Sequence, residues 1–181
     1  RFLRMGGAFF LRRSFKGSAV YPAVFTKYLA VMMARGHSIE YFIEGGRSRT
    51  GRLLEPKTGM LSMTVRAFLR DPRRPVVFVP VYFGYERLME GQTYLGELAG
   101  KAKQSESAGD LLRILPRLRE RYGRVQVSFG EPLDLATLVR AHAPDWREHP
   151  TRDEARPPWL AGVIDDLANT IMRRINAAAA A

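Results

Sequence analysis

The run VVFVPVYF at residues 76–83 constrains the fold of this chain most, because every residue in it except Pro80 is β-branched or aromatic. Such a run predicts a strand that is buried on both faces. Pro80 has no N–H to donate, so we expect an edge, a bulge or the end of the strand at this residue. Shorter apolar runs at residues 7–12 and 39–43, and an alternating run at 124–129, predict further strands.

Segments with helical periodicity separate and follow these strands. Residues 18–35 have Ser18 as a candidate N-cap and Gly36 as a candidate C-cap, and residues 58–69 and 159–175 have similar spacing. The alternation predicts an α/β domain with a mostly parallel or mixed central sheet flanked by helices. The other segments are expected to be a polar surface excursion at 86–109, a helix bent near Pro116 at 110–122, and a proline-rich loop at 144–158.

The charge balance indicates an anionic partner. The 181 residues contain 29 Lys and Arg against 18 Asp and Glu, which gives a formal charge of +11. Nucleic acid, an anionic membrane and phosphorylated substrates all fit this charge. The chain has no cysteine, which excludes disulfides, thiolate metal sites and thiol nucleophiles. No apolar stretch reaches the roughly 18 residues of a membrane-spanning helix.

The segment FIEGGRSRTGR at residues 42–52 is the strongest candidate for a functional site. An expected strand ends there and meets a carboxylate, two glycines and several arginines. Glycines let backbone N–H groups approach a ligand, and arginine offers forked donors that suit phosphate. The segment is not a P-loop, because Arg52-Leu53 stands where Lys-Ser/Thr is required. An anion site and a solvated turn with incidental arginines both remain open from these residues alone.

Several segments, taken in order, resemble the membrane-associated glycerolipid acyltransferase family, in the version found in bacterial glycerol-3-phosphate acyltransferases. GAFFLRR at 7–13 is similar to the second conserved block, FIEGGRSRTG to the third, and Val79-Pro80-Val81 to the fourth. EPKTG at 55–59 and FGEP at 129–132 also resemble that family. Any one block is a weak signal, but three in order make the joint match strong. We therefore expect one acyltransferase domain over residues 1–181, with the strongest likeness at 1–135 and a C-terminal loop and helix at 136–181.

The resemblance implies a reaction and a set of site residues. The reaction would move an acyl group from acyl-CoA or acyl-carrier protein to the first hydroxyl of glycerol 3-phosphate, giving lysophosphatidate in phospholipid synthesis. No metal or other cofactor is implied. Pro80 and Lys57 are expected on the acyl-donor side. The residues expected to bind glycerol 3-phosphate are Arg12, Arg13, Glu44, Gly45, Gly46, Arg47, Ser48 and Arg49.

The catalytic signature of the family is a histidine followed five residues later by an aspartate, and no histidine here has that partner. His149 is followed at that spacing by Glu154, but this pair lies in a proline-rich loop at the wrong end of the domain. The chain begins at Arg1 and ends in an alanine run. We therefore expect an internal piece of a longer enzyme, with the catalytic pair upstream of Arg1 and no turnover by the piece alone.

The expected location is peripheral, at the cytoplasmic face of the bacterial inner membrane, with an anionic membrane surface as a further partner and no nucleic acid. The alternative is a basic, non-catalytic module that binds RNA or an anionic surface. It would explain the charge of +11 without catalysis. The usual signatures of RNA-binding modules are missing from the sequence.

Overall fold

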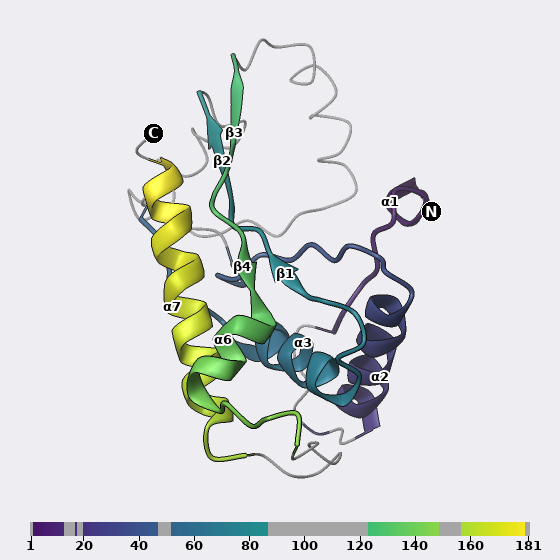
Figure 1. The fold of residues 1–181 in the computed structure, drawn as a ribbon. Coiled ribbons are helices and arrows are strands. Elements are labelled where there is room, and N and C mark those ends of the chain that lie inside the picture. Colours follow the sequence, from purple (N-terminus) through teal and green to yellow (C-terminus); the bar gives the residue numbers. More distant parts are fainter. Residues whose placement is uncertain are drawn as a thin grey trace.

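The computed structural model describes residues 2–12, 17, 20–46, 52–86, 123–148 and 157–179. Helices pack around two short antiparallel strand pairs (Figure 1). In chain order the described elements are α1 (Phe2–Met5), α2 (Val20–Ala34), α3 (Gly59–Arg70), β1 (Val77–Phe78), β2 (Val81–Tyr85), β3 (Val125–Phe129), β4 (Leu133–Asp134), α6 (Leu135–His142) and α7 (Leu160–Ala179).

The three helices expected from periodicity are confirmed. α2 ends where Gly36 adopts a left-handed φ of 79° and donates its N–H to the carbonyl of Met33 at 2.9 Å, as glycine does after many helices. α3 ends just before the Asp71-Pro72 pair. α7 extends beyond the expected residue 175 to Ala179, because the alanines that follow favour helix. The helix expected at 110–122 lies outside the described residues, as does the excursion expected at 86–109 except for Glu86.

Residues 77–85 form a strand that is interrupted at Val79 and Pro80, as the proline predicted. β1 pairs with β4 and β2 pairs with β3, both antiparallel. Between the two pairs, Val79 and Pro80 face three residues, 130–132, so the ribbon has a bulge at this point. The Gly130 N–H donates to the Pro80 carbonyl at 2.8 Å, and this bond joins the two strands across the bulge.

The described strands differ from the expected sheet in three ways. Residues 7–12 and 39–43 form no strand, and none of the described strands pairs in parallel. The side chains of Val77, Val79 and Phe83 are 41–51% exposed, so the central run is not buried on both faces. Phe9 explains the first error, because its ring lies 6.0 Å from that of Phe25 and 5.5 Å from that of Tyr28 on α2. The Phe9 ring therefore packs on a helix rather than on a neighbouring strand.

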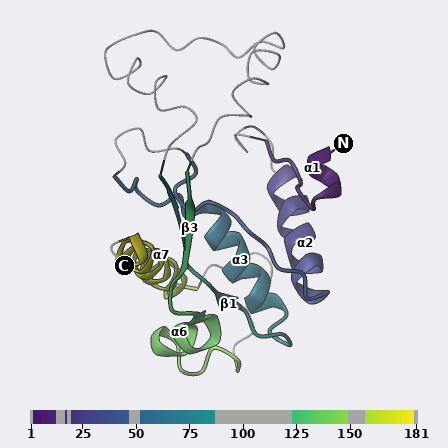
Figure 2. The same ribbon diagram turned by 90° about the horizontal axis from the view of Figure 1, so that it is seen from above.

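The main core lies between α3, α6 and α7. Phe68 on α3, Val139 on α6 and Leu167 on α7 are all fully buried in one cluster, and Phe68 lies 5.4 Å from the ring of Trp146. α2 packs on the other side of α3, and α7 also packs against β2 and β3 (Figures 1 and 2). No helix within the described ranges is long and apolar enough to cross a bilayer.

Candidate active-site loop

The glycine- and arginine-rich loop is closed at its base by one backbone hydrogen bond. Ile43 is buried in the core, and its carbonyl accepts the N–H of Lys57 at 2.7 Å. This bond joins the end of the core segment to the residues that lead into α3. The chain between Ile43 and Lys57 therefore leaves the core and returns to it at one point. Its described parts are residues 44–46 and 52–56.

Glu44 ties the two arms of this loop together. Its Oε2 atom accepts the backbone N–H of Leu54 at 2.8 Å. A carboxylate that accepts a backbone N–H forms a charge-assisted hydrogen bond, which is stronger than a neutral one. The carboxylate of Glu44 thus helps to set the shape of the loop.

Gly45 is required by the backbone of the loop. Its φ is +60°, in the left-handed region, and its N–H donates to the carbonyl of Phe42 at 3.1 Å. A Cβ at this position would lie 2.8 Å from Cγ of Lys57, in the inner part of that side chain. Gly46 is different, because a Cβ there would meet only Leu54 Cδ1, at 3.9 Å. Of the expected site residues, the structure therefore brings Glu44, Gly45 and Lys57 together.

Arg12 is held against the start of α2. Its backbone N–H donates to Oη of Tyr21 at 3.2 Å, and its guanidinium carbon lies 5.0 Å from the centre of the Tyr21 ring. This cation–π contact orients the side chain at an exposed site. Among the described residues, the contact shown for Arg12 is Tyr21. No pattern in the sequence predicted this pairing.

Pro80 is buried at the bulge of the ribbon, with α7 beside it. Its carbonyl accepts the Gly130 N–H, and a Cβ on Gly130 would lie 3.3 Å from Cβ of Pro80. Arg174 on α7 donates to the carbonyls of Glu131 and Pro132 at 2.5 and 2.9 Å, and it pairs with the Glu131 carboxylate at 3.1 Å. Pro80 therefore lies where several hydrogen bonds join the strands to α7. Lys57, the other residue expected on the acyl-donor side, lies instead beside Gly45 in the loop.

The remaining expected anion-binding residues, Arg13, Arg47, Ser48 and Arg49, lie outside the described residues, as do His149 and Glu154. The convergence of Arg13 and Arg47 on one anion site stays a prediction.

Tyr41, which the sequence did not single out, lies just before the loop and packs against the core. Its hydroxyl is buried and has no partner of good geometry among the residues that the structure describes, and the neighbouring Thr64 hydroxyl donates to the carbonyl of Met60 at 3.0 Å. Burial raises the pKa of Tyr41 to about 12, and Thr64 opposes this only in part.

Comparison with known proteins finds a matching family for each half of the chain. Residues 1–84 match the family described as Acyltransferase, and residues 94–181 match the glycerol-3-phosphate acyltransferase C-terminal region. Proteins named glycerol-3-phosphate acyltransferase from Pseudomonas paraeruginosa and Xanthomonas campestris are each 56% identical over 178 residues, which is 98% of this chain. The chain belongs to the glycerol-3-phosphate acyltransferase family.

A third relative with the same name, from Pseudomonas syringae pv. tomato, is 53% identical over 98% of the chain. The chain spans about a fifth of the length of these acyltransferases, 21% of the Pseudomonas proteins and 20% of the Xanthomonas one. The expected fold class holds at the level of an acyltransferase domain with helices and small antiparallel sheets.

Proposed function

We propose that the protein containing this chain transfers an acyl group from acyl-CoA or acyl-carrier protein to the first hydroxyl of glycerol 3-phosphate, releasing lysophosphatidate. The observation that carries this proposal is 56% identity over 98% of the chain to proteins named for that activity. Both matched families are acyltransferase families, and they lend no support to the alternative of an RNA-binding module.

The loop that begins at Glu44 is our candidate for the glycerol-phosphate site. The Glu44–Leu54 hydrogen bond and the left-handed Gly45 shape its two ends, and Lys57 lies against Gly45. Arg47, Ser48 and Arg49 follow in the sequence between these ends. Cations and hydroxyl donors suit a dianionic phosphate, because they donate charge-assisted hydrogen bonds to its oxygens.

The base that would take the hydroxyl proton is expected outside these 181 residues. A general base contributes typically 10²–10⁴-fold to a rate. We therefore expect the 181-residue chain to bind glycerol 3-phosphate weakly, with a dissociation constant of about 1 mM, and to show no acyl transfer. Robust turnover by this chain would contradict the proposal and make His149 and Glu154 the first pair to mutate.

Arg47→Ala tests the substrate assignment in the protein that contains this sequence. Loss of a charge-assisted contact to phosphate should raise the KM for glycerol 3-phosphate by roughly ten- to hundredfold, and the KM for acyl-CoA much less. Arg140→Ala is the matched control, because Arg140 is an exposed arginine on α6. An equal rise in both KM values would indicate general damage to the fold and contradict the assignment.

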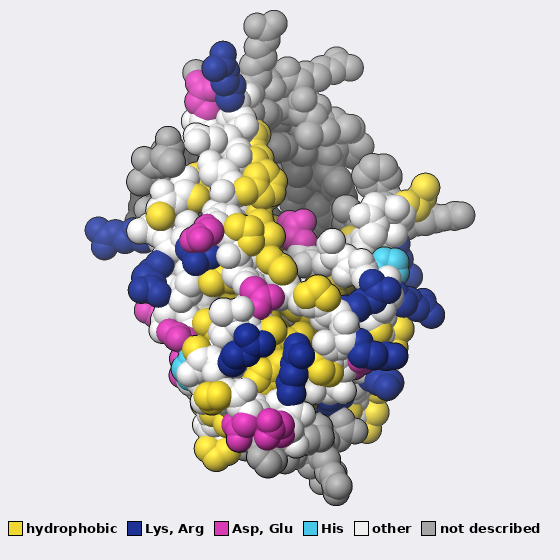
Figure 3. Space-filling view, viewed as in Figure 1, with side chains coloured by type: hydrophobic (Ala, Val, Ile, Leu, Met, Phe, Trp, Pro, Cys, Tyr) yellow, Lys and Arg dark blue, Asp and Glu magenta, His cyan; other side chains and the backbone are white. Residues whose placement is uncertain are grey.

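We also propose that the protein works as a peripheral protein at the cytoplasmic face of the bacterial inner membrane, against an anionic lipid surface. The charge of +11 supports this, and Figure 3 shows Lys and Arg side chains among hydrophobic ones on one face. Val20, Val24 and Val31 on α2 are 71%, 61% and 38% exposed. Co-sedimentation with anionic vesicles, and not with zwitterionic ones, is the expected result.

A further inference from the structure

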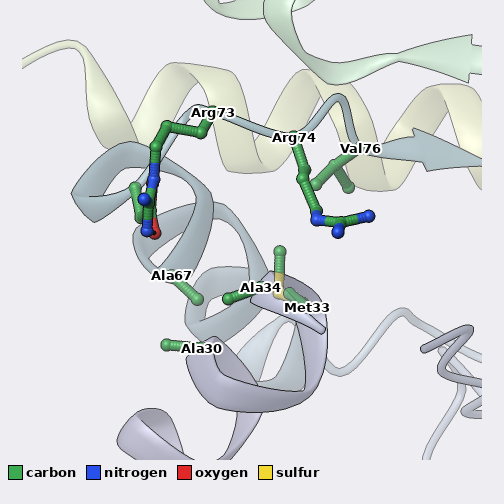
Figure 4. A pocket seen from close by; sticks show the side chains of 8 residues that line it. Ala30, Met33, Ala34, Ala67, Arg73, Arg74 and Val76 are labelled. Carbon is green, nitrogen blue, oxygen red and sulfur yellow. Dashed lines mark hydrogen bonds and ion pairs between the residues drawn. The ribbon is translucent and has the colours of Figure 1, made fainter. Parts of the chain in front are cut away.

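A cavity lies at the far end of α3 from the glycine loop. It has a volume of about 370 Å³ and lies between the C-terminal ends of α2 and α3 and the turn at residues 71–76 (Figure 4). Cavities of a few hundred Å³ are large enough for a small ligand. The loop at Gly45 precedes the first turn of α3, and twelve helical residues separate the two places by about 18 Å. This cavity is therefore distinct from the described ends of the glycine loop.

The floor of the cavity is apolar. None of its side chains offers a strong hydrogen-bonding group, so a sugar or a polar headgroup gains nothing there. Methionine is flexible and adapts its shape to an inserted alkyl chain. The floor also has no aromatic ring on which a nucleobase could stack. It consists of Ala30, Met33 and Ala34 from α2, Ala67 from α3, and Val76.

The rim of the cavity is cationic. Asp71 is the only carboxylate among the lining residues, and both of its oxygens accept from Arg73, at 2.6 Å each. The negative charge of Asp71 is therefore neutralised by the positive charge of Arg73. Arg74 makes no ion pair or hydrogen bond with any described residue. Its guanidinium is the second cation among the residues that line the cavity.

The side chain of Arg74 lies above the floor of the cavity. In Figure 4 the side chains of Arg73 and Arg74 descend from the turn on two sides of the cavity, above Ala34 and Met33. Gly36 allows this approach, because a Cβ there would lie 2.8 Å from Nη1 of Arg74. A guanidinium beside an apolar floor suits a ligand with one charged end and one apolar end.

We propose that this cavity binds a single-chain amphiphile with an oxyanion head, either a fatty carboxylate or an alkyl phosphate monoester. The alkyl chain lies on the floor formed by Ala30, Met33 and Ala67, and the head receives the donors of Arg74. The proposal concerns a site apart from the glycine loop, and it does not depend on the proposed acyl transfer.

Calorimetric titration of the 181-residue chain with monomeric ligands tests the proposal. Dodecyl phosphate and dodecanoate should both bind, and the tighter of the two identifies the head. Dodecyl maltoside, which has a neutral head, should bind roughly ten- to hundredfold more weakly. Inorganic phosphate and glycerol 3-phosphate, which have no alkyl chain, should not compete. From octyl to decyl phosphate the affinity should rise by about fourfold for each methylene that the cavity buries.

Two variants separate the head from the chain. Arg74→Ala should weaken the anionic ligands roughly ten- to hundredfold and leave dodecyl maltoside unchanged. Ala34→Trp, at an exposed position at the end of α2, should fill the floor and weaken all the alkyl ligands. Arg140→Ala removes the same charge from α6, away from the cavity, and should change neither class. Circular dichroism checks that each variant is folded.

Four results would overturn the proposal. Equal effects of Arg74→Ala and Arg140→Ala would show that the ligands follow overall charge. An affinity independent of chain length would show that the floor is not used. Competition by glycerol 3-phosphate would place the ligand at the glycine loop. Binding of anionic vesicles that depends on Arg74, without binding of monomeric ligands, would show that the rim contacts a bilayer and would also overturn it.

Discussion

Gly45 has little freedom to change, because two separate constraints meet at this residue. Its backbone is left-handed, at a φ of +60°, and the inner part of the Lys57 side chain occupies the space that a Cβ would need. A left-handed conformation costs a residue with a Cβ roughly 1–2 kcal/mol. Gly46 has neither constraint, since its φ is not positive and its nearest neighbour is 3.9 Å away.

We therefore expect Gly45→Ala to lower the free energy of unfolding by about 1–2 kcal/mol and to weaken glycerol 3-phosphate binding. Gly46→Ala is the matched control and should change stability by less than about 0.5 kcal/mol. Urea unfolding and calorimetry measure the two effects. Equal losses in both variants would contradict the geometry described for the loop.

The buried hydroxyl of Tyr41 predicts an unusual response to mutation. Within the described part of the chain it has no partner of good geometry, and a buried group left unsatisfied costs about 1–3 kcal/mol. Tyr41→Phe should therefore leave the free energy of unfolding at pH 7 unchanged or raise it by up to about 2 kcal/mol. Tyr85→Phe, at a half-exposed position on β2, should have no effect. A large loss of stability in Tyr41→Phe would show that the hydroxyl has a partner.

The same residue predicts how stability depends on alkaline pH. The pKa of Tyr41 is raised from 10.0 to about 12 in the folded state, so the folded protein holds this proton more tightly than the unfolded chain does. The contribution is complete below pH 10 and is lost as the pH rises through 12, at up to about 1.4 kcal/mol per pH unit. Denaturant unfolding between pH 9 and 12 should show a smaller decline in Tyr41→Phe than in the parent. Parallel declines would contradict the raised pKa.

At the scale of elements, α6 depends on Asp134, the residue just before it. Asp134 has an extended backbone, and its Oδ1 atom accepts the N–H of Thr137 at 2.7 Å, which is the geometry of an N-cap. Asp134 also ends β4, opposite Val77, so the cap fixes where the strand becomes a helix. Leu135 and Val139 on this helix are fully buried.

We expect Asp134→Ala to lower the free energy of unfolding by about 1 kcal/mol. Asp134→Asn keeps the side-chain acceptor and should lose only the favourable charge at the helix start, about 0.3–1 kcal/mol. Thermal unfolding compares the two variants. If alanine were no worse than asparagine, the side-chain hydrogen bond would contribute nothing.

At the scale of the whole molecule, Phe68 joins the central helix to the C-terminal half. It is 1% exposed on α3, and its ring lies beside that of Trp146, which follows α6. Phe68→Ala should lower the free energy of unfolding by about 3–5 kcal/mol, while Phe129→Ala, at a site 72% exposed, should change it by less than about 0.5 kcal/mol.

Phe68→Leu, a smaller change, keeps this test informative if the alanine variant does not fold. Unfolding followed by tryptophan emission and by circular dichroism should give one transition, because Trp146 belongs to the same core as α3 and α7. Two separate transitions would show that the halves of the chain unfold independently.

Local signals in the sequence determined the helices and the family. α2, α3 and α7 could be predicted because apolar spacing and end signals such as Gly36 act within one helix. The break at Pro80 could be predicted because a missing N–H is a property of the residue itself. The order of the conserved blocks indicated the family, and the relatives confirm it.

Only the tertiary structure decided how the apolar runs are used. A β-branched or aromatic run predicts that its side chains are packed, but it does not predict which element they pack against. Phe9 packs on α2, Ile43 enters the core, and residues 77–85 pair antiparallel with a segment some forty residues later. α6 was missed because eight residues carry little periodicity, and its stability comes from its cap and from packing against α7. The contacts of Glu44 with Leu54 and of Gly45 with Lys57 also join residues that only the folded loop brings together.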